Sequence, residues 1–407
     1  MTSSDRGGGT LVITGASGFL GRQLVPLFAD AGYDLLLCGR DLAALAQRFP
    51  GVPVCAVEDL SDRLDRGPHA LLHLAVMNSD RDGTEAAFFQ ANVTYLEEVL
   101  RHARAVGVAH VIYPSSFHVQ RAVQTPYAKS KAAAEALVAG CTDMRTTILR
   151  LPAVYGTSFQ GRLAMLNRFK GPLRGLVFDA LRSLRSTVDV RRVFDAMDRA
   201  LRDEAAPVEI VADDQDDNRV YRFGKRLIDL AFVFAVVVFL WWLLALIWLA
   251  IRLTSAGPAL FIQERVGRDR AIFRCCKFRT MHVGTAEVGT HDAPQQAITK
   301  VGAVLRRLKF DELPQVWNLL RGEMTLVGPR PCLPVQEALI AARAARNVFD
   351  LRPGVSGLAQ VNGIDMSTPE ALAEIDAVYA KTRTLVMDIK IILATLPGVS
   401  VPAEVKV

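Results

Sequence analysis

A run of 22 consecutive uncharged residues, from Leu230 to Ile251, constrains this chain more than any other feature of its sequence. A helix of that length rises ~33 Å, which is enough to cross the ~30 Å hydrocarbon core of a bilayer. The alternative is a buried helix of a soluble domain, but such helices rarely stay apolar on every face. The run therefore predicts a membrane-embedded hydrophobic helix.

Basic residues flank this run on both sides, which bears on its topology. A helix that spans a membrane normally keeps its basic flank on the cytoplasmic side alone. We therefore expect a re-entrant anchor with both flanking domains on the cytoplasmic face, rather than a span. The run contains no Pro or Gly, the usual sources of a sharp kink, and has Trp241 and Trp242 at its middle. The flanking basic residues are Arg222, Lys225, Arg226, Arg252, Arg265, Arg268 and Arg270.

Charge is distributed unevenly along the 407 residues. Residues 1–220 carry 25 Lys and Arg against 26 Asp and Glu, whereas residues 221–407 carry 23 against 16. The basic second half favours anionic partners, and we expect membrane lipids and phosphates rather than nucleic acid. An acidic stretch near residue 213 marks the expected boundary. The predicted parts are a domain at 1–215, a basic linker with the membrane helix at 216–254, and a catalytic domain at 255–407.

Composition and cysteine usage exclude several classes of protein. Hydrophobic residues make up 51% of the chain and charged residues 22%, which excludes a disordered or fibrous protein. The six cysteines are scattered without a C-x-x-C pair. They argue for a reducing compartment and against a disulfide framework or a zinc site. The first ten residues lack an apolar segment, so we expect no secretory signal.

Short apolar strands alternate with helices through the first half of the chain. Strands are expected at TLVITG, YDLLLCG, LLHLAV and HVIYPSS, with helices through 85–106 and from about residue 127. This alternation predicts a Rossmann-like, doubly wound parallel sheet. The fold class expected for the chain is α/β, with this domain followed by the membrane helix and a small, mostly helical α/β domain. Residues 284–298 read as a loop, and the Ala-rich stretch 332–347 reads as a helix.

Three glycines, Gly15, Gly18 and Gly21, form a G-x-x-G-x-x-G turn between the first strand and its helix. Glycine is needed where the backbone approaches a pyrophosphate, and the helix N-terminus favours negative charge. The turn therefore predicts a dinucleotide site. At the end of the second strand, Arg40 favours the 2′-phosphate of NADP, although the adjacent Asp41 keeps NAD open. Asp59 is a candidate adenine contact, with an ordinary loop acid as the alternative.

A second signal is the pair Tyr127 and Lys131, with Ser116 upstream at a strand end. Residues four apart share one face of a helix. A lysine ammonium lowers the pKa of a neighbouring phenol, which then exchanges a proton with an alcohol or ketone near neutrality. The Ser116 hydroxyl would hold the carbonyl oxygen of the substrate.

In the second half, Asp311 and Glu312 stand side by side in a basic neighbourhood. Adjacent acids alone usually mark a solvated helix end. Here two acids accompany many cations, a combination that suits Mg²⁺, a nucleophile and a bound diphosphate. The candidate phosphate contacts are Lys277, Arg279, Arg306, Arg330 and Arg352.

Residues 10–200 resemble the extended short-chain dehydrogenase/reductase family of sugar-nucleotide epimerases, dehydratases and ketoreductases. The matching pieces are GASGFLG, LLHLAV, YPSSFHV, PYAKSK, Arg150 to Gly156, and VDVRRVFDAM. The resemblance implies Ser116 and Tyr127 as catalytic residues, with Lys131 as the partner of the tyrosine. The spacing from Ser116 to Tyr127 is short for the family and the part after Gly156 is brief, so the substrate stays open.

Residues 221–395 resemble the bacterial sugar transferase family, the monotopic polyprenyl-phosphate phosphoglycosyl transferases. The ordered motifs are KRLIDL, ERVGR, KFRTM, KFDELPQ, MTLVGPRP, RPGVSGLAQVNG and VMDIK. The resemblance implies that Asp311 attacks the β-phosphorus of a UDP-sugar, that UMP leaves, and that polyprenyl phosphate then accepts the phosphosugar. Asp311 and Glu312 would hold Mg²⁺, and Asp388 is a weaker site candidate. The family usually breaks its membrane helix with a Ser-Pro pair, which this chain lacks.

Together these features predict a bifunctional enzyme of the bacterial inner membrane that begins the assembly of a surface glycan such as an O-antigen or exopolysaccharide. The first domain is expected to reduce or epimerise the UDP-sugar, with reduction of a UDP-4-keto-6-deoxy-sugar as the specific hypothesis. The alternative is a non-catalytic domain that binds NAD(P) or senses the nucleotide sugar. A homodimer is one option for the assembly, which the sequence does not fix.

Overall fold

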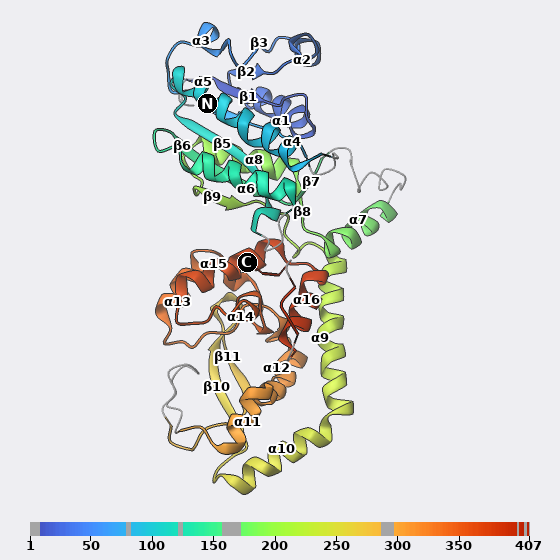
Figure 1. The fold of residues 1–407 in the computed structure, drawn as a ribbon. Coiled ribbons are helices and arrows are strands. Elements are labelled where there is room, and N and C mark those ends of the chain that lie inside the picture. Colours follow the sequence, from blue (N-terminus) through green and yellow to red (C-terminus); the bar gives the residue numbers. More distant parts are fainter. Residues whose placement is uncertain are drawn as a thin grey trace. The chain divides into compact units, whose positions relative to one another are not determined.

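The computed structural model describes residues 9–78, 83–120, 125–156, 172–285, 297–396, 399–402 and 405–406. The chain divides into two compact units (Figure 1). The first consists of Met1–Phe178 and Ser186–Asp213, and the second of Asp179–Arg185 and Asp214–Val407. Much of the expected loop at 284–298, and part of the segment after Gly156, lie outside the described residues.

A seven-stranded parallel sheet forms the centre of the first unit, in the order β3-β2-β1-β4-β5-β6-β9. This order confirms the Rossmann-like sheet that the alternation predicts. Strands β7 and β8 form a separate parallel pair outside this sheet. The strands are β1 (Leu11–Thr14), β2 (Leu35–Cys38), β3 (Val54–Cys55), β4 (Ala70–His73), β5 (His110–Ser116), β6 (Arg145–Leu151), β7 (Ala153–Tyr155), β8 (Thr187–Asp189) and β9 (Val208–Ile210).

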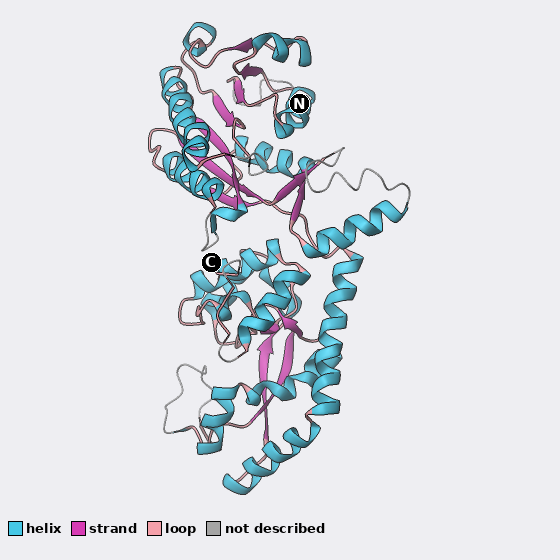
Figure 2. Ribbon diagram, turned by 45° about the vertical axis from the view of Figure 1, so that its right-hand side comes forward, coloured by secondary structure: helices cyan, strands magenta, loops and turns pink. Residues whose placement is uncertain are grey.

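Helices cover both faces of this sheet (Figure 2) because the side chains of a strand alternate between its faces. Leu11 and Ile13 of β1 belong to the core formed with α1 and α8, whereas Val12 belongs to the core formed with α5 and α6. The helices are α1 (Phe19–Asp30), α2 (Leu42–Arg48), α3 (Leu60–Arg63), α4 (Glu85–Phe89), α5 (Tyr95–Ala105), α6 (Pro126–Ala139) and α8 (Val190–Leu201), with the π-helical turn η2 (Gln90–Thr94) and the 3-10 turn η3 (Phe117–Gln120). Helix α7 (Pro172–Leu184) begins in the first unit and continues into the second from Asp179.

The second unit is mostly helical, with two short sheets that bring its loops together. Strands β10 (Leu260–Val266) and β11 (Ile272–Phe278) pair antiparallel, and β12 (Thr325–Val327) pairs parallel with β13 (Gly354–Ser356). The helices are α9 (Arg219–Phe239), α10 (Trp241–Thr254), α11 (Lys300–Leu308), α12 (Val316–Arg321), α13 (Glu337–Ala344), α14 (Leu358–Val361), α15 (Pro369–Thr382) and α16 (Leu385–Thr395), with the 3-10 turns η5 (Arg268–Arg270), η7 (Phe310–Gln315) and η8 (Val348–Asp350).

The long apolar run is not one straight helix. It lies in α9 and α10, which are bent by 68° across Leu240. Within the described residues, no single helix is long and apolar enough to cross a membrane, while this bent pair has the length and composition when taken together. A bend near the middle of the run fits a broken span as well as the re-entrant anchor that the flanking charges predict.

The bend arises without proline. Leu240 has φ −115° and ψ 9°, which departs from helical geometry, and the next residue starts α10. The indole N–H of Trp242 donates to the backbone oxygen of Phe239 at 2.9 Å, so this carbonyl at the end of α9 keeps a hydrogen-bond partner. The bend thus coincides with an indole hydrogen bond, in a run that contains no proline.

We predict that Trp242→Phe loosens this bend, because phenylalanine keeps an aromatic ring but has no N–H donor. Loss of one hydrogen bond costs about 1 kcal/mol, enough to broaden the distribution of bend angles. Spin labels on Leu230→Cys and Leu249→Cys in lipid nanodiscs measure the effect as a longer and broader distance distribution. Trp241→Phe is the matched control, and an unchanged distribution in Trp242→Phe would contradict the role of the indole.

Candidate functional site

The glycine turn of the first unit approaches neighbouring backbone closely and leads into a helix without a side-chain cap. Gly15 has φ +71°, and a Cβ there would lie 2.4 Å from the backbone nitrogen of Ala75. A Cβ on Gly21 would lie 2.5 Å from the backbone of Ala16. Gly18 is the N-cap of α1, with no side-chain cap and no acid in the first turn. These residues fit the pyrophosphate of a dinucleotide, because the first N–H groups of α1 have no side-chain cap and no acid lies in the first turn.

The three candidates for the nucleoside end all lie beyond the strand ends. Arg40 and Asp59 are exposed, which leaves both side chains accessible to a ligand. The Asp41 carboxylate accepts from the backbone N–H of Ala44 at 3.0 Å and caps α2. Because Asp41 is engaged in this cap, Arg40 is the better placed of the two to meet a ribose substituent.

The three candidate catalytic residues of the first unit lie on two neighbouring elements. Ser116 ends β5, and Tyr127 and Lys131 lie one turn apart on α6, which packs against that strand. Lys131 Nζ donates to the backbone oxygen of Pro114 at 2.8 Å and lies 4.2 Å from the ring centre of Tyr113. The structure therefore brings the lysine to the end of the strand that carries Ser116.

Lys131 is buried, with 1% of its surface exposed. Burial lowers the pKa of its ammonium to about 7. The lysine is therefore fully charged only below neutral pH. This limits how far its charge lowers the pKa of Tyr127, and the sequence alone does not reveal this limit. Beside the lysine, burial and the charge of Lys131 lower the pKa of His73 to about 3. A ring nitrogen of His73 shares a hydrogen bond of 2.9 Å with the Thr14 hydroxyl.

In the second unit, Asp311 and Glu312 lie in the 3-10 turn η7, directly after α11. Between the two elements, Lys309 has a left-handed backbone with φ 58°, which ends the helix and turns the chain. A residue other than glycine in this conformation stores about 1–3 kcal/mol of strain. The turn η7 packs against β11, the strand of Lys277.

Two cations from distant parts of the unit bind Glu312, whose side chain is 12% exposed. Lys277 Nζ donates to its Oε1 at 3.1 Å, and the Arg330 guanidinium donates to the same oxygen at 2.8 Å. Burial alone would raise the pKa of this carboxyl, but the charges of Arg330 and Lys277 outweigh burial and hold the pKa at about 2. Glu312 therefore stays ionised at neutral pH.

For Asp311, burial outweighs the charges of the neighbouring cations, in contrast to Glu312. Burial and the neighbouring charge of Glu312 raise the pKa of the Asp311 carboxyl, and the charges of three cations offset this rise in part. Because Glu312 takes the direct contacts, Asp311 is the more basic of the two carboxylates. Basicity favours Asp311 as the nucleophile of the pair.

Three of the five predicted phosphate contacts act on this acid pair, namely Lys277, Arg306 and Arg330. Arg306 Nε also donates to the Thr280 hydroxyl at 2.9 Å. The pocket beside Glu312 has a volume of only about 10 Å³, room for about one water. The acids thus lie packed against their cations, and a substrate phosphate has to replace part of these contacts.

The other two predicted contacts lie elsewhere. Arg279 is 7% exposed, and its guanidinium donates to the backbone oxygen and hydroxyl of Ser255 at 2.9 and 3.2 Å. It fastens the chain after α10 to β11. Arg352 lines a separate cavity of about 830 Å³ that shares no lining residue with the pocket at Glu312. No described contact joins either arginine to the acid pair.

The acid pair was predicted to hold Mg²⁺. In the described part of the chain, no three His, Cys, Asp or Glu side chains gather closely enough to hold a metal. Magnesium commonly takes one or two carboxylates and completes its shell with water and substrate phosphates. Both cations contact Oε1 of Glu312, so Oε2 and the Asp311 carboxylate fit this limited role.

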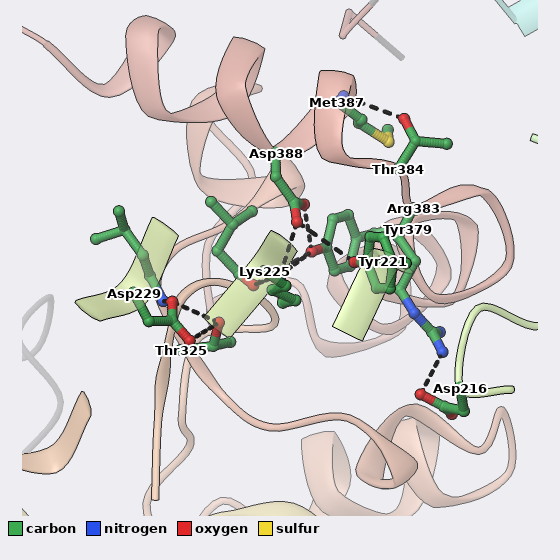
Figure 3. Close-up of polar contacts among 12 residues, drawn as sticks. Asp216, Tyr221, Lys225, Asp229, Thr325, Tyr379, Arg383, Thr384, Met387 and Asp388 are labelled. Atoms are coloured by element: carbon green, nitrogen blue, oxygen red, sulfur yellow. Dashed lines mark hydrogen bonds and ion pairs between the residues drawn. The ribbon is translucent and has the colours of Figure 1, made fainter. Parts of the chain in front are cut away.

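Asp388, the weaker site candidate, lies in a buried polar network (Figure 3). It accepts from the hydroxyls of Tyr379 at 2.7 Å and Tyr221 at 3.3 Å, and from Lys225 Nζ at 2.8 Å. Lys225 also donates to the backbone oxygen of Val327 at 2.8 Å. The network joins α9, β12, α15 and α16, which indicates a structural role for Asp388.

Sequence reasoning missed a buried ion pair that positions Arg330. Arg343 and Asp376 are each 2% exposed, and their charged groups lie 2.6 Å apart. Arg343 also donates to the backbone oxygen of Arg330 at 2.8 Å. The pair thus fixes the residue whose side chain reaches Glu312. No local pattern distinguishes Arg343, because its partner is 33 positions away.

Comparison with family models matches each unit separately. Residues 220–401 match the bacterial sugar transferase family, and residues 11–212 match the NAD dependent epimerase/dehydratase family. Both resemblances expected from the motifs are thereby confirmed.

Curated relatives match the second half of the chain. The UDP-glucose:undecaprenyl-phosphate glucose-1-phosphate transferase of Caulobacter vibrioides is 40% identical over 187 residues, which cover 43% of this chain and 68% of that protein. The undecaprenyl-phosphate glucose phosphotransferase of Komagataeibacter xylinus is 38% identical, over 42% of this chain and 35% of its own length. The UDP-N-acetylgalactosamine-undecaprenyl-phosphate N-acetylgalactosaminephosphotransferase of Aeromonas hydrophila is 36% identical, over 44% of each. The chain thus spans less than half the length of the last two.

Solved structures similar to this chain include two nucleotide-sugar enzymes. The UDP-glucose 4-epimerase of Thermus thermophilus, in complex with NAD, is 20% identical, with a TM-score of 0.37, and the match covers 50% of this chain and 77% of that one. The dTDP-glucose 4,6-dehydratase of Streptomyces venezuelae is 18% identical, with a TM-score of 0.38, over 50% of this chain and 75% of that one.

We predict that Glu312→Gln removes a pH-dependent contribution of about 3 kcal/mol to stability. The folded-state pKa of about 2 lies below the ordinary value of 4.5. Ionised Glu312 therefore stabilises the fold above pH 4.5, and this contribution is lost as the pH falls from 4.5 toward 2. Urea unfolding in detergent, at neutral pH and at several acidic pH values, measures the free energy of unfolding of wild type and variant. The difference between the two is expected to become smaller as the pH falls.

Glu374→Gln, on the exposed face of α15, is the control for this series and leaves the unfolding free energy unchanged. A gap between wild type and Glu312→Gln that stays constant with pH would contradict the charge contacts assigned to Glu312.

Proposed function

The chain belongs to the bacterial sugar transferase family and carries an NAD dependent epimerase/dehydratase domain, and from this premise we propose that it transfers a sugar phosphate from a UDP-sugar to polyprenyl phosphate. The observation that carries the proposal is the acid pair, in which Glu312 is held by Lys277 and Arg330 while Asp311 keeps the more basic carboxylate. The relatives named above act on UDP-sugars and undecaprenyl phosphate.

In the first step of the proposed reaction, an oxygen of Asp311 attacks the β-phosphorus of the UDP-sugar. The bond between the β-phosphorus and the bridging oxygen breaks, and UMP leaves with that oxygen. The product on the protein is a phosphosugar ester of Asp311. Lys277 and Arg330 stabilise the charge that collects on the phosphoryl oxygens, since each lies within reach of the carboxylate pair.

In the second step, a phosphate oxygen of polyprenyl phosphate attacks the same phosphorus. The ester bond to Asp311 breaks, the carboxylate is regenerated, and the polyprenyl-diphospho-sugar departs. Glu312 and Asp311 would hold Mg²⁺, which neutralises diphosphate charge when bound. The remaining candidate contact for the diphosphate is Arg306, whose charge acts on Asp311.

We place the bent helices α9 and α10 in the cytoplasmic leaflet of the bacterial inner membrane as a re-entrant anchor. Many of their large apolar side chains are exposed, among them Phe234, Phe239, Trp241 and Leu253. Such an uncovered apolar surface favours lipid. A re-entrant anchor keeps both units on the cytoplasmic face, where UDP-sugars and NADP are found, and brings the acid pair to the lipid substrate.

For the first unit we propose an NADP-dependent reductase that prepares the UDP-sugar, acting on a UDP-4-keto-6-deoxy-sugar. The support is the glycine turn before the uncapped helix α1, the engagement of Asp41 in a helix cap, and Lys131 beside the strand of Ser116. Tyr127 would give its proton to the sugar oxygen, which the Ser116 hydroxyl orients. NADP would supply the hydride when bound.

We predict that Asp311→Asn abolishes UMP release from a UDP-sugar panel in the presence of polyprenyl phosphate and Mg²⁺, because an amide oxygen is a poor nucleophile. Wild-type release is expected to fall in acid at a pH above the ordinary range of an aspartate, since the pKa of Asp311 is raised. Mass spectrometry of acid-quenched wild type measures the phosphosugar on the peptide of Asp311. Glu374→Gln is the matched control, and UMP release by Asp311→Asn would overturn the assignment.

We predict that Arg40→Gln weakens NADPH binding at least about tenfold and leaves NADH binding unchanged, because an arginine–phosphate pair is worth about 1.5–3 kcal/mol. Calorimetric titration of the full chain measures both affinities. Arg48→Gln, an exposed arginine on α2, is the control. Equal losses for the two cofactors would exclude Arg40 as the contact of the 2′-phosphate.

Consumption of NADPH with a UDP-4-keto-6-deoxy-sugar tests the reductase itself. Loss of this activity in Tyr127→Phe is expected. NADPH binding without turnover, unaffected by Tyr127→Phe, would instead favour a regulatory nucleotide-binding domain.

A further inference from the structure

The cavity of about 830 Å³ in the second unit has no part in the proposed transfer steps. It lies among the first turns of α9, the end of α12, β12, η8 and the side chains of Tyr379 and Arg383. Its size is within the ~300–1,000 Å³ range of small-molecule sites. It is a candidate for a second binding site, distinct from the acid pair.

The lining of the cavity is strongly basic. Eight Arg and Lys side chains line it against three Asp side chains. Two of these acids are already engaged, because Asp216 pairs with Arg383 at 2.9 Å and Asp229 accepts from the Thr325 hydroxyl at 2.9 Å (Figure 3). The cavity therefore carries excess positive charge, which favours an anionic ligand.

The cations of the cavity fall into two groups. Those of the floor are engaged in contacts within the protein, and those of the rim are exposed. On the floor, Lys225 is engaged with Asp388 and Arg226 donates to the backbone oxygen of Leu319 at 2.7 Å. On the rim, Arg219, Arg222 and Arg352 are exposed, and they form no ion pair with any residue that the structure describes. Guanidinium groups without a partner, in one cavity, suit the oxygens of a phosphate.

An apolar stripe runs from the mouth of the cavity along α9. Phe223, which lines the cavity, is 72% exposed, and Leu227, Leu230 and Phe234 are 56%, 38% and 60% exposed. Their spacing of four, three and four residues places them on one face of the helix. A ligand with a phosphate in the cavity and an apolar tail on this stripe would match both surfaces.

The position of the cavity along α9 agrees with the depth of a headgroup. Arg226 lies 14 residues before Leu240, where the helix bends, and at ~1.5 Å per residue the separation is about 21 Å. Half of a bilayer's hydrocarbon core is ~15 Å thick. With the bend inside the leaflet, Arg226 therefore lies near the level of the lipid phosphates, and the rim residues Arg222 and Arg219 lie about one and two helical turns further from the bilayer centre.

We infer that this cavity binds the phosphate headgroup of an anionic glycerophospholipid, whose acyl chains lie along the stripe of Phe223, Leu227, Leu230 and Phe234. The inference rests on the membrane position proposed above for α9. A bound lipid would hold the start of the membrane segment at a fixed depth next to the polar network of Lys225.

Native mass spectrometry of the full chain in detergent, titrated with phosphatidylglycerol or phosphatidylcholine, tests this site. We expect wild type to retain one phosphatidylglycerol at least about tenfold more tightly than phosphatidylcholine. Arg219→Gln/Arg222→Gln is expected to lose this preference. The control Arg274→Gln/Arg307→Gln removes the same charge from exposed positions outside the cavity and keeps the preference.

Inorganic pyrophosphate separates the lipid from a soluble phosphate. If it binds the cavity alone, displaces phosphatidylglycerol and depends on the same two arginines, the ligand is a soluble phosphate and the lipid assignment is wrong. Equal retention of the two lipids by wild type, or an unchanged preference in Arg219→Gln/Arg222→Gln, also overturns it.

UMP release and lipid retention are measured on the same preparations, so that the two proposals fail separately. Lipid preference without UMP release contradicts the transferase alone. UMP release that stops in Asp311→Asn, without any lipid preference, contradicts the headgroup site alone.

Discussion

The contacts of Glu312 with Lys277 and Arg330 are the interaction on which the second unit's site depends. They tie together the turn η7, strand β11 and the loop after β12, across 35 and 18 positions of sequence. A buried carboxylate without these partners would cost several kcal/mol or take up a proton. With them, Glu312 stays ionised, and its charge raises the pKa of Asp311. Two chemically similar neighbours thereby acquire different properties, one as a fixed anion and the other as a more basic carboxylate.

The parts of the molecule that could be predicted from the sequence are those with a local physical cause. The alternation of strands and helices predicted the parallel sheet. The glycines of the turn after β1 are required because the backbone at Gly15 and Gly21 lies close to its neighbours. The acid pair and its motif neighbours identified the family. What escaped prediction depends on long-range contacts: Arg279 reaches Ser255 instead of the acid pair, and Arg352 lines another cavity. Basic residues in motifs look alike in a sequence, and only the fold determines which of them face the acids.

The buried network around Asp388 explains how the apolar segment is fastened to the rest of the second unit. Lys225 and Tyr221 near the start of α9 meet Asp388 of α16, and Lys225 also reaches Tyr379 of α15 at 3.1 Å. Each donor in this network has a partner, which buried polar groups require. One face of the first two turns of α9 therefore packs into the fold, whereas the exposed apolar stripe begins at Phe223 on another face of the helix.

The bend at Leu240 differs in kind from a bend made by proline. Proline removes a backbone N–H permanently, so a straight helix is never restored. Here every residue around the bend keeps its N–H, and the indole of Trp242 competes with the main chain for the oxygen of Phe239. The bend is thus accompanied by a side-chain hydrogen bond and is not fixed by the covalent structure of a proline. In the proposed anchor, such a bend would let the helix pair change its profile in bilayers of different thickness, at the cost of a single hydrogen bond.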